Sequence, residues 1–260
     1  MVNDNKMISM NISRIDRNNN NTPILYDREI DEFAHAVLED YKPKLLKEPG
    51  AIRFEHFLES YLGVTIMFKD IYNADPERPV LGAFTFRGGA LDVFDRENMR
   101  VSHMIVRPNT VVIDNAVMQP GREGQAMFTG LHEGGHLMIH AGVHKTETRG
   151  EKLPSIVYCR RGTVENFGGS RTLRTPEAWR EHQADYFASA LSMPNATFVP
   201  FVHELLREHG VFKKYIALGE DDDLDILGKD LLPERIAEVY GVSKRAALIK
   251  LKKSGFIADL

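Results

Sequence analysis

The segment AMFTGLHEGGHLMIHAG, residues 126–142, decides the fold of this 260-residue chain. Its apolar residues recur at helical spacing, and a small residue and a glycine end it, so the pattern predicts a helix. His132 and His136 are four positions apart, which on a helix places both side chains on one face, about one turn from each other. Two imidazole nitrogens in that arrangement can bind one tetrahedral metal ion.

Glu133 follows the first histidine, and together they form an HExxH motif. A carboxylate at this position can take a proton from a water molecule that the ion activates. The adjacent Gly134 and Gly135 should each cost about 1 kcal/mol relative to alanine in a helix. We therefore expect a strand or a substrate to approach the helix closely there. The alternative is a partly exposed helix with two incidental histidines.

A catalytic metal ion needs a third protein ligand. One known spacing would place a histidine at position 142, which is Gly142 here, so that class is excluded. A later helix offers another solution, because Thr175 and Pro176 are a typical helix start and Pro194 a typical stop.

Two carboxylates on this later helix, Glu181 and Asp185, lie about 40° apart on the face that carries the apolar stripe. Buried carboxylates require positive partners. A metal ion for Glu181 and an imidazole N–H for Asp185 would supply them. Salt bridges to arginine or lysine are the bland alternative.

The rest of the chain predicts an α+β fold, in which a small, mostly antiparallel sheet packs on the HExxH helix. Helical periodicity is found in residues 24–41 and 52–62. Short runs rich in β-branched and aromatic residues follow at positions 64–68, 80–86, 90–94, 101–106 and 110–114. We expect residues 142–175 to be irregular.

Three units are expected along the chain. Residues 1–23 are polar and predict a mobile tail, residues 24–218 form the main domain, and residues 219–260 form a helical segment that resembles a helix-turn-helix. The net charge of −4 argues against a protein that mainly coats nucleic acid. A single cysteine excludes a disulfide framework, and no apolar run is long enough to span a membrane, so we expect a cytoplasmic protein.

The strings HEGGHLMIH (residues 132–140) and EHQADYFASALSMP (residues 181–194) resemble the ImmA/IrrE family of metallopeptidases. The resemblance implies a zincin-like fold of gluzincin type and one Zn²⁺ per chain. It also implies cleavage of a helix-turn-helix transcriptional repressor in a stress or mobile-element response. By this resemblance His132, His136 and Glu181 are the zinc ligands, Glu133 is the catalytic base and Asp185 supports a ligand histidine.

The chain departs from the family pattern in two places. Gln183 stands where many members have a second glutamate. The interval of 45 residues between His136 and Glu181 is also longer than expected, because of residues 144–175.

Several roles stay open at the sequence level. His140 lies one turn beyond His136, where a structural or supporting role is expected rather than direct ligation. Cys159 could cap the zinc in a latent state or be inert, and residues 144–175 could form a lid or a recognition loop. An oxyanion intermediate would need a hydrogen-bond donor. The candidates are Tyr158, Arg160, His182 and Tyr186.

The sequence thus predicts a zinc-dependent endopeptidase that binds an extended protein substrate along the edge strand of its sheet. The alternative is a regulatory protein that has a vestigial zinc site and binds DNA or another partner through its C-terminal helices.

Overall fold

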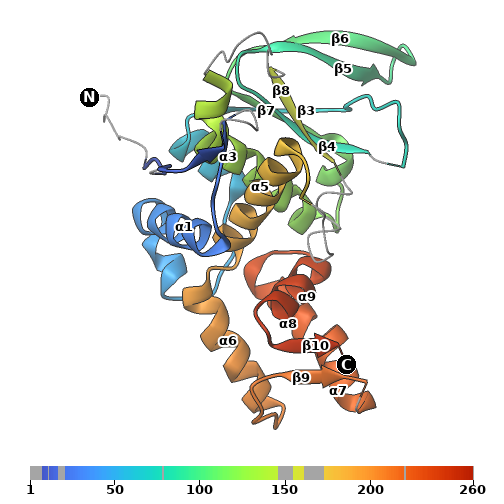
Figure 1. The fold of residues 1–260 in the computed structure, drawn as a ribbon. Coiled ribbons are helices and arrows are strands. Elements are labelled where there is room, and N and C mark those ends of the chain that lie inside the picture. Colours follow the sequence, from blue (N-terminus) through green and yellow to red (C-terminus); the bar gives the residue numbers. More distant parts are fainter. Residues whose placement is uncertain are drawn as a thin grey trace.

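The computed structural model describes residues 8–10, 12–16, 21–77, 79–145, 155–160, 173–219 and 221–259. Helices and small sheets are combined in one chain, which confirms the α+β class (Figure 1). Among the helices of these residues, none has the length and apolar character that a membrane-crossing segment needs.

The main sheet has four strands in the order β3-β7-β4-β8. These strands are β3 (Thr65–Lys69), β7 (Thr110–Asp114), β4 (Val80–Thr85) and β8 (Ile156–Arg160). Only the β3–β7 pair is parallel, so the sheet is mostly antiparallel as predicted.

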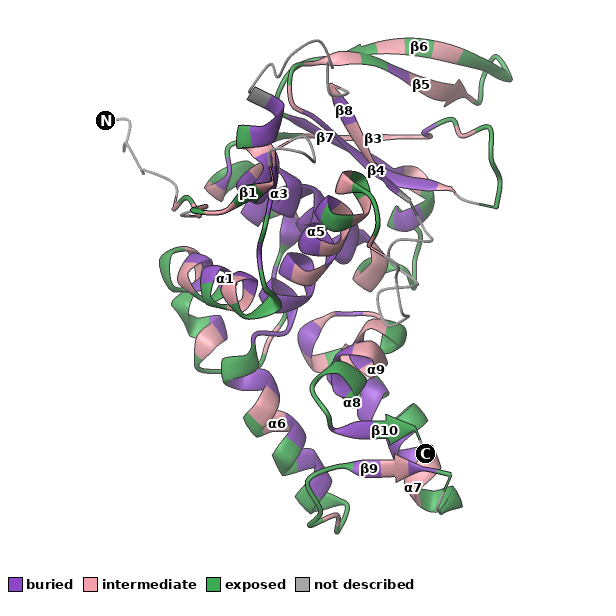
Figure 2. Cartoon of the chain, in the orientation of Figure 1, coloured by how far each residue is buried: buried purple, intermediate pink, exposed green. Residues whose placement is uncertain are grey.

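Two details of the sheet differ from the sequence prediction. Strand β8 lies inside residues 142–175, which we expected to be irregular. Strands β5 (Gly89–Asp95) and β6 (Arg100–Val106) pair with each other as a separate two-stranded sheet. Strands β4 and β7 are buried throughout, whereas most residues of this hairpin are exposed or half-buried (Figure 2).

Helices α3 (Glu123–Lys145) and α5 (Pro176–Ser192) cross at the centre of the molecule, and most of their residues are buried (Figure 2). Helix α5 begins as predicted: the Thr175 hydroxyl accepts a hydrogen bond from the Ala178 amide at 3.1 Å, and Pro176 occupies the first turn.

The two adjacent glycines of α3 allow the close approach that we expected, but the neighbours are helical rather than a strand or a substrate. A Cβ atom on Gly135 would lie 3.2 Å from the Ala184 Cα of α5. A Cβ atom on Gly134 would lie 3.2 Å from the Phe57 ring, in the π-helical turn Phe57–Tyr61. This turn follows the short helix α2 (Phe54–His56), so residues 54–61 of the predicted helix 52–62 form one helical segment with an irregular hydrogen-bond pattern.

The N-terminal residues are more ordered than the expected mobile tail wherever the structure describes them. Strand β1 (Ile15–Asp16) pairs with β2 (Thr22–Pro23), and Ile8 and Met10 pack against the core. Helix α1 (Asp27–Tyr41) follows and lies beside α5 (Figure 1). The 3-10 turn Pro43–Leu46 ends this region.

The C-terminal part is helical, as expected, with one small parallel sheet. It comprises α6 (Asn195–Glu208), β9 (Ile216–Leu218), α7 (Asp222–Ile226), the π-helical turn Leu227–Leu231, α8 (Leu232–Tyr240), α9 (Lys244–Lys253) and β10 (Ile257–Asp259). Gly241 adopts φ +67° after α8, and the Ser243 hydroxyl accepts a hydrogen bond from the Ala246 amide at the start of α9. DNA binding by this helix pair stays a prediction.

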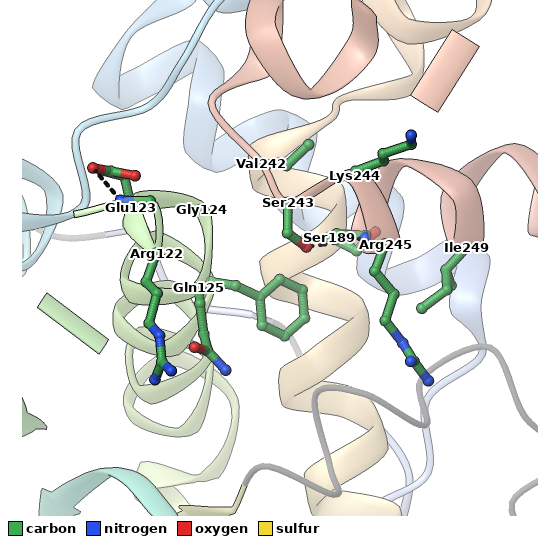
Figure 3. A pocket seen from close by; sticks show the side chains of 13 residues that line it. Arg122, Glu123, Gly124, Gln125, Ser189, Val242, Ser243, Lys244, Arg245 and Ile249 are labelled. Carbon is green, nitrogen blue, oxygen red and sulfur yellow. Dashed lines mark hydrogen bonds between the residues drawn. The ribbon is translucent and has the colours of Figure 1, made fainter. Parts of the chain in front are cut away.

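The turn between α8 and α9 packs against the first turn of α3 (Figure 3). A Cβ atom on Gly124 would lie only 2.4 Å from the Ser243 backbone nitrogen, so a glycine is needed for this contact. A cavity of about 420 Å³ opens beside the contact, and its lining includes Arg122, Gln125 and Arg245. None of the predicted metal ligands lines this cavity, so the candidate site lies elsewhere.

Candidate metal centre

His132, His136 and Glu181 converge at the crossing of α3 and α5, where they are positioned to bind a metal ion. The two imidazole Nε2 atoms are 3.0 Å apart. The Glu181 carboxylate oxygens lie 3.5 Å from Nε2 of His132 and 3.2 Å from Nε2 of His136. Glu181 lies 45 positions after His136 in the chain, so the helix crossing brings it to the two histidines.

A carboxylate orients His132. The Nδ1 atom of His132 lies 2.8 Å from the Asp185 Oδ1 atom, and both side chains are fully buried. Since an ionised carboxylate only accepts hydrogen bonds, Nδ1 carries the proton and Nε2 has a free lone pair.

A chain of neutral groups orients His136. The Gln183 side-chain amide donates to the Pro23 carbonyl at 2.7 Å, which turns its Oε1 atom toward His140 Nε2, 2.9 Å away. His140 therefore donates from Nε2, and its Nδ1 atom accepts from Nδ1 of His136 at 3.1 Å. This network assigns the lone pair of His136 to Nε2.

These assignments place two Nε2 lone pairs and a carboxylate oxygen around one point. At 3.0 Å two lone pairs repel each other unless a proton or a metal ion lies between them. Metal–ligand bonds of about 2.0–2.1 Å in a tetrahedron place neighbouring donors roughly 3.3–3.4 Å apart, close to the separations found here. The donor set thus fits a metal ion.

The catalytic candidate Glu133 lies beside these donors. It is completely buried, and neither of its carboxylate oxygens makes a hydrogen bond of ordinary length within the described residues. Burial raises the pKa of Glu133 to about 8, against the opposing effects of His132 and the nearby Cys159 amide. A buried carboxyl group without a partner is costly for folding, and such groups are typical of functional sites.

Glu181 provides the route from the donors to solvent. Its side chain is 21% exposed, whereas those of His132 and His136 are at most 1% exposed. Burial alone would raise the pKa of Glu181, but its close contacts with His136 and His132 hold the pKa well below its usual range. The carboxylate is therefore ionised, as a metal ligand must be.

The thiol of Cys159 also reaches this site. Its Sγ atom, a nitrogen of His132 and a carboxylate oxygen of Glu133 all lie within 4.8 Å of one another. Cys159 is completely buried on β8, and burial raises the pKa of its thiol to about 12 although His132 opposes the shift.

The residues predicted to stabilise an oxyanion lie away from His132, His136 and Glu181 wherever their side chains are described. Tyr158 packs on the opposite face of the main sheet, in the cluster that contains Ile71 and Ile156. His182 and Tyr186 face α1, where His182 Nε2 lies 3.1 Å from Asp27 Oδ1 and the Tyr186 hydroxyl donates to Asp31 at 2.9 Å.

These placements correct the prediction for the three residues, and the reason is local geometry. Neighbouring residues on a strand face opposite sides, and residues 182 and 186 lie on the face of α5 that packs against α1. The side chain of Arg160, the fourth candidate, lies outside the described residues.

Sequence reasoning missed the role of two residues in this site. Gln183 was noted only as a departure from the family pattern, but its side chain accepts a hydrogen bond from His140. Gly82 of β4 allows the sheet to approach Glu133, since a Cβ atom there would lie 3.1 Å from the Glu133 Oε1 atom. A glycine inside an apolar strand was the available signal for such a close approach.

No family model matches the sequence, and no curated protein matches it significantly.

Proposed function

We propose that the protein is a zinc-dependent endopeptidase with a zincin-like active site on α3 and α5. One observation carries this proposal: two Nε2 lone pairs and an ionised carboxylate converge on one point, and the unpartnered Glu133 lies beside it. A set of two imidazoles and one carboxylate, with a fourth position left for water or substrate, is typical of catalytic zinc.

Each residue then has a defined task. His132, His136 and Glu181 hold the ion, and Asp185 and the His140–Gln183 pair keep the imidazoles in the correct tautomer. When bound, zinc supplies Lewis acidity, which polarises a carbonyl group and lowers the pKa of water. Glu133 accepts the proton of the attacking water and passes it to the leaving amine, since no ordinary hydrogen bond within the described residues holds its carboxylate.

The proposed substrate is an extended segment of a protein. A peptide in this conformation could pair with the backbone of the main sheet, next to the donors. The resemblance to ImmA/IrrE metallopeptidases favours a helix-turn-helix repressor as the natural substrate.

Metal analysis and cleavage of dye-quenched casein test the proposal together. We expect about one zinc ion per purified chain. We expect Glu133→Gln to retain the metal and to lose about 10²–10⁴-fold in cleavage rate, the usual contribution of a general base. His136→Ala is the matched control, which should lose the metal as well. Full activity in Glu133→Gln would remove Glu133 from the mechanism, and a metal-free wild-type protein that cannot be loaded would remove the zinc site.

A further inference from the structure

Strand β8 occupies the edge of β4 that a substrate peptide would need. The two strands are antiparallel, with Thr85 opposite Ile156 and Ala83 opposite Tyr158. This pairing uses the backbone donors and acceptors through which an extended peptide adds to a sheet edge. Within the described residues, the protein therefore covers its own β4 edge with a segment of its own chain (Figure 1).

The register turns Cys159 toward the metal donors. Cys159 lies opposite Gly82, next to a bulge in the pairing. A side chain on Gly82 would point at α3, where its Cβ atom would meet Thr129 at 2.7 Å and Glu133 at 3.1 Å. Residues directly opposite each other on neighbouring strands share a face of the sheet, so the thiol also faces α3.

The thiol is close enough to take part in the site. Its Sγ atom lies within 4.8 Å of a nitrogen of His132 and of a carboxylate oxygen of Glu133, and these three atoms form a second group of possible metal ligands. The Nδ1 atom of His132 is engaged with Asp185, so its Nε2 atom, which faces Glu181 and His136, is the one available to the thiol.

A second observation points to the same place independently. Both oxygens of the buried Glu133 lie without an ordinary hydrogen bond within the described residues, on the side of the donors where Cys159 enters. The thiol and a nitrogen of His132 thus lie beside a carboxylate that has no ordinary hydrogen bond within the described residues.

We propose that Cys159 is the fourth ligand of the metal held by His132, His136 and Glu181, and that β8 is an internal strand that keeps the peptidase latent. This inference rests on the proposed function. Three protein ligands leave a zinc site open for chemistry, whereas a fourth closes it. On ligation the S–H bond breaks and a sulfur–metal bond forms, while the Glu133 carboxylate accepts the proton and releases it to solvent.

Activation then requires one displacement with two consequences. When β8 leaves β4, the edge of the sheet becomes available for an extended substrate. The same movement breaks the sulfur–metal bond, and the released thiolate takes up a proton from solvent. The fourth position then returns to water, with Glu133 as the nearest base. A partner or substrate that competes for β4 would thus open the site while it binds.

Cobalt substitution of the full-length chain tests the ligand assignment without an activity measurement. A thiolate bound to Co²⁺ gives a sulfur-to-metal charge-transfer absorption in the near ultraviolet. Since the chain has a single cysteine, such a band can come only from Cys159. We expect the band in the wild-type protein and its loss in both Cys159→Ser and Cys159→Ala, which should keep the visible bands of bound cobalt. Ile156→Val, a conservative change on the other face of β8, should keep both.

The outcomes separate this inference from the proposed function. Visible cobalt bands without a charge-transfer band in the wild type would overturn ligation by Cys159 and leave the metal site intact. Failure of the wild type to bind cobalt would overturn the metal site, and the latency with it.

Casein cleavage tests the latency itself. Suppose that the form with Cys159 bound to the metal outnumbers the form with a free fourth position by about ten to one. Cys159→Ser should then cleave casein about tenfold faster than the wild type. Equal rates in the two proteins would overturn the latency, and no cleavage by either metal-loaded protein would overturn the peptidase function.

Discussion

The two histidines of the candidate metal centre lie four residues apart on one helix, yet two different regions of the protein orient them. His132 depends on a single charged contact, the buried carboxylate of Asp185. His136 depends on a series of neutral groups that runs through His140 and Gln183 to the Pro23 carbonyl of β2.

The difference shows how far each support extends through the fold. The first involves only α3 and α5, whereas the second connects these helices to the N-terminal strand. A carboxylate makes the attached imidazole more basic, while the neutral series fixes its tautomer without adding charge near the ion. The pair of supports therefore orients both rings and adds only one negative charge beside Glu181.

Among substitutions of the residues that orient the two histidines, Asp185→Asn should weaken zinc binding most. The amide has nearly the shape of the carboxylate but no charge, and it can present an N–H group to Nδ1 of His132, which would favour the wrong tautomer. We expect zinc affinity to fall about 10–100-fold, the usual range for a residue that supports a metal ligand. Competition with a chromophoric chelator measures the affinity, and circular dichroism checks that the fold is retained. An unchanged affinity would mean that His132 does not depend on the carboxylate.

Gln183→Leu should have a smaller effect, about tenfold in zinc affinity, because it removes a neutral partner of His140 and leaves the ligands untouched. Gln183→Glu is the matched control. It keeps an acceptor for His140, loses the N–H group that bonds to the Pro23 carbonyl and adds a carboxylate. If the neutral series matters through His140, the glutamate variant should bind zinc more tightly than the leucine variant. Equal losses in the two variants would show that the link to β2, which both of them lack, is the important part.

The comparison also shows what could be predicted from the sequence. Helical spacing placed His132, Glu133 and His136 on one face, and the cap at Thr175 with the apolar stripe of α5 placed Glu181 and Asp185. Both inferences use local geometry, which one helix determines by itself. The α+β class could be predicted for the same reason, since periodicity distinguishes strands from helices.

The features that the sequence did not reveal depend on contacts between distant segments. Nothing near Gln183 indicates that its amide bonds to Pro23, 160 residues earlier. Strand β8 is only five residues long and stands alone between segments without a clear period, so its pairing with β4 could not be inferred. His182 and Tyr186 were misassigned because a polar residue near a site on a helical wheel can still face another helix.

Both supports exist only because α3 and α5 approach closely at Gly135 and Ala184. Gly135 lies between the two histidine ligands, and Ala184 lies between Gln183 and Asp185. A Cβ atom on Gly135 would meet the Ala184 Cα atom at 3.2 Å, its carbonyl oxygen at 3.3 Å and the Phe187 ring at 3.2 Å. Two of these neighbours are backbone atoms, so the helices would have to separate.

Gly135→Ala should therefore destabilise the protein by about 1–3 kcal/mol from overpacking, less the roughly 1 kcal/mol that alanine gains in a helix. Gly142→Ala, on the same helix, is the matched control, because a Cβ atom there would have no neighbour within 4 Å. It should stabilise the protein by up to about 1 kcal/mol. Urea denaturation of the metal-free proteins measures the free energy of unfolding of both variants. If Gly135→Ala destabilises the protein and Gly142→Ala stabilises it, the close helix crossing holds the two supports together. Gly135→Ala should then also weaken zinc binding. Stabilisation by both substitutions would mean that α5 can move away from α3 at little cost, and the supports would have to be fixed by their hydrogen bonds alone.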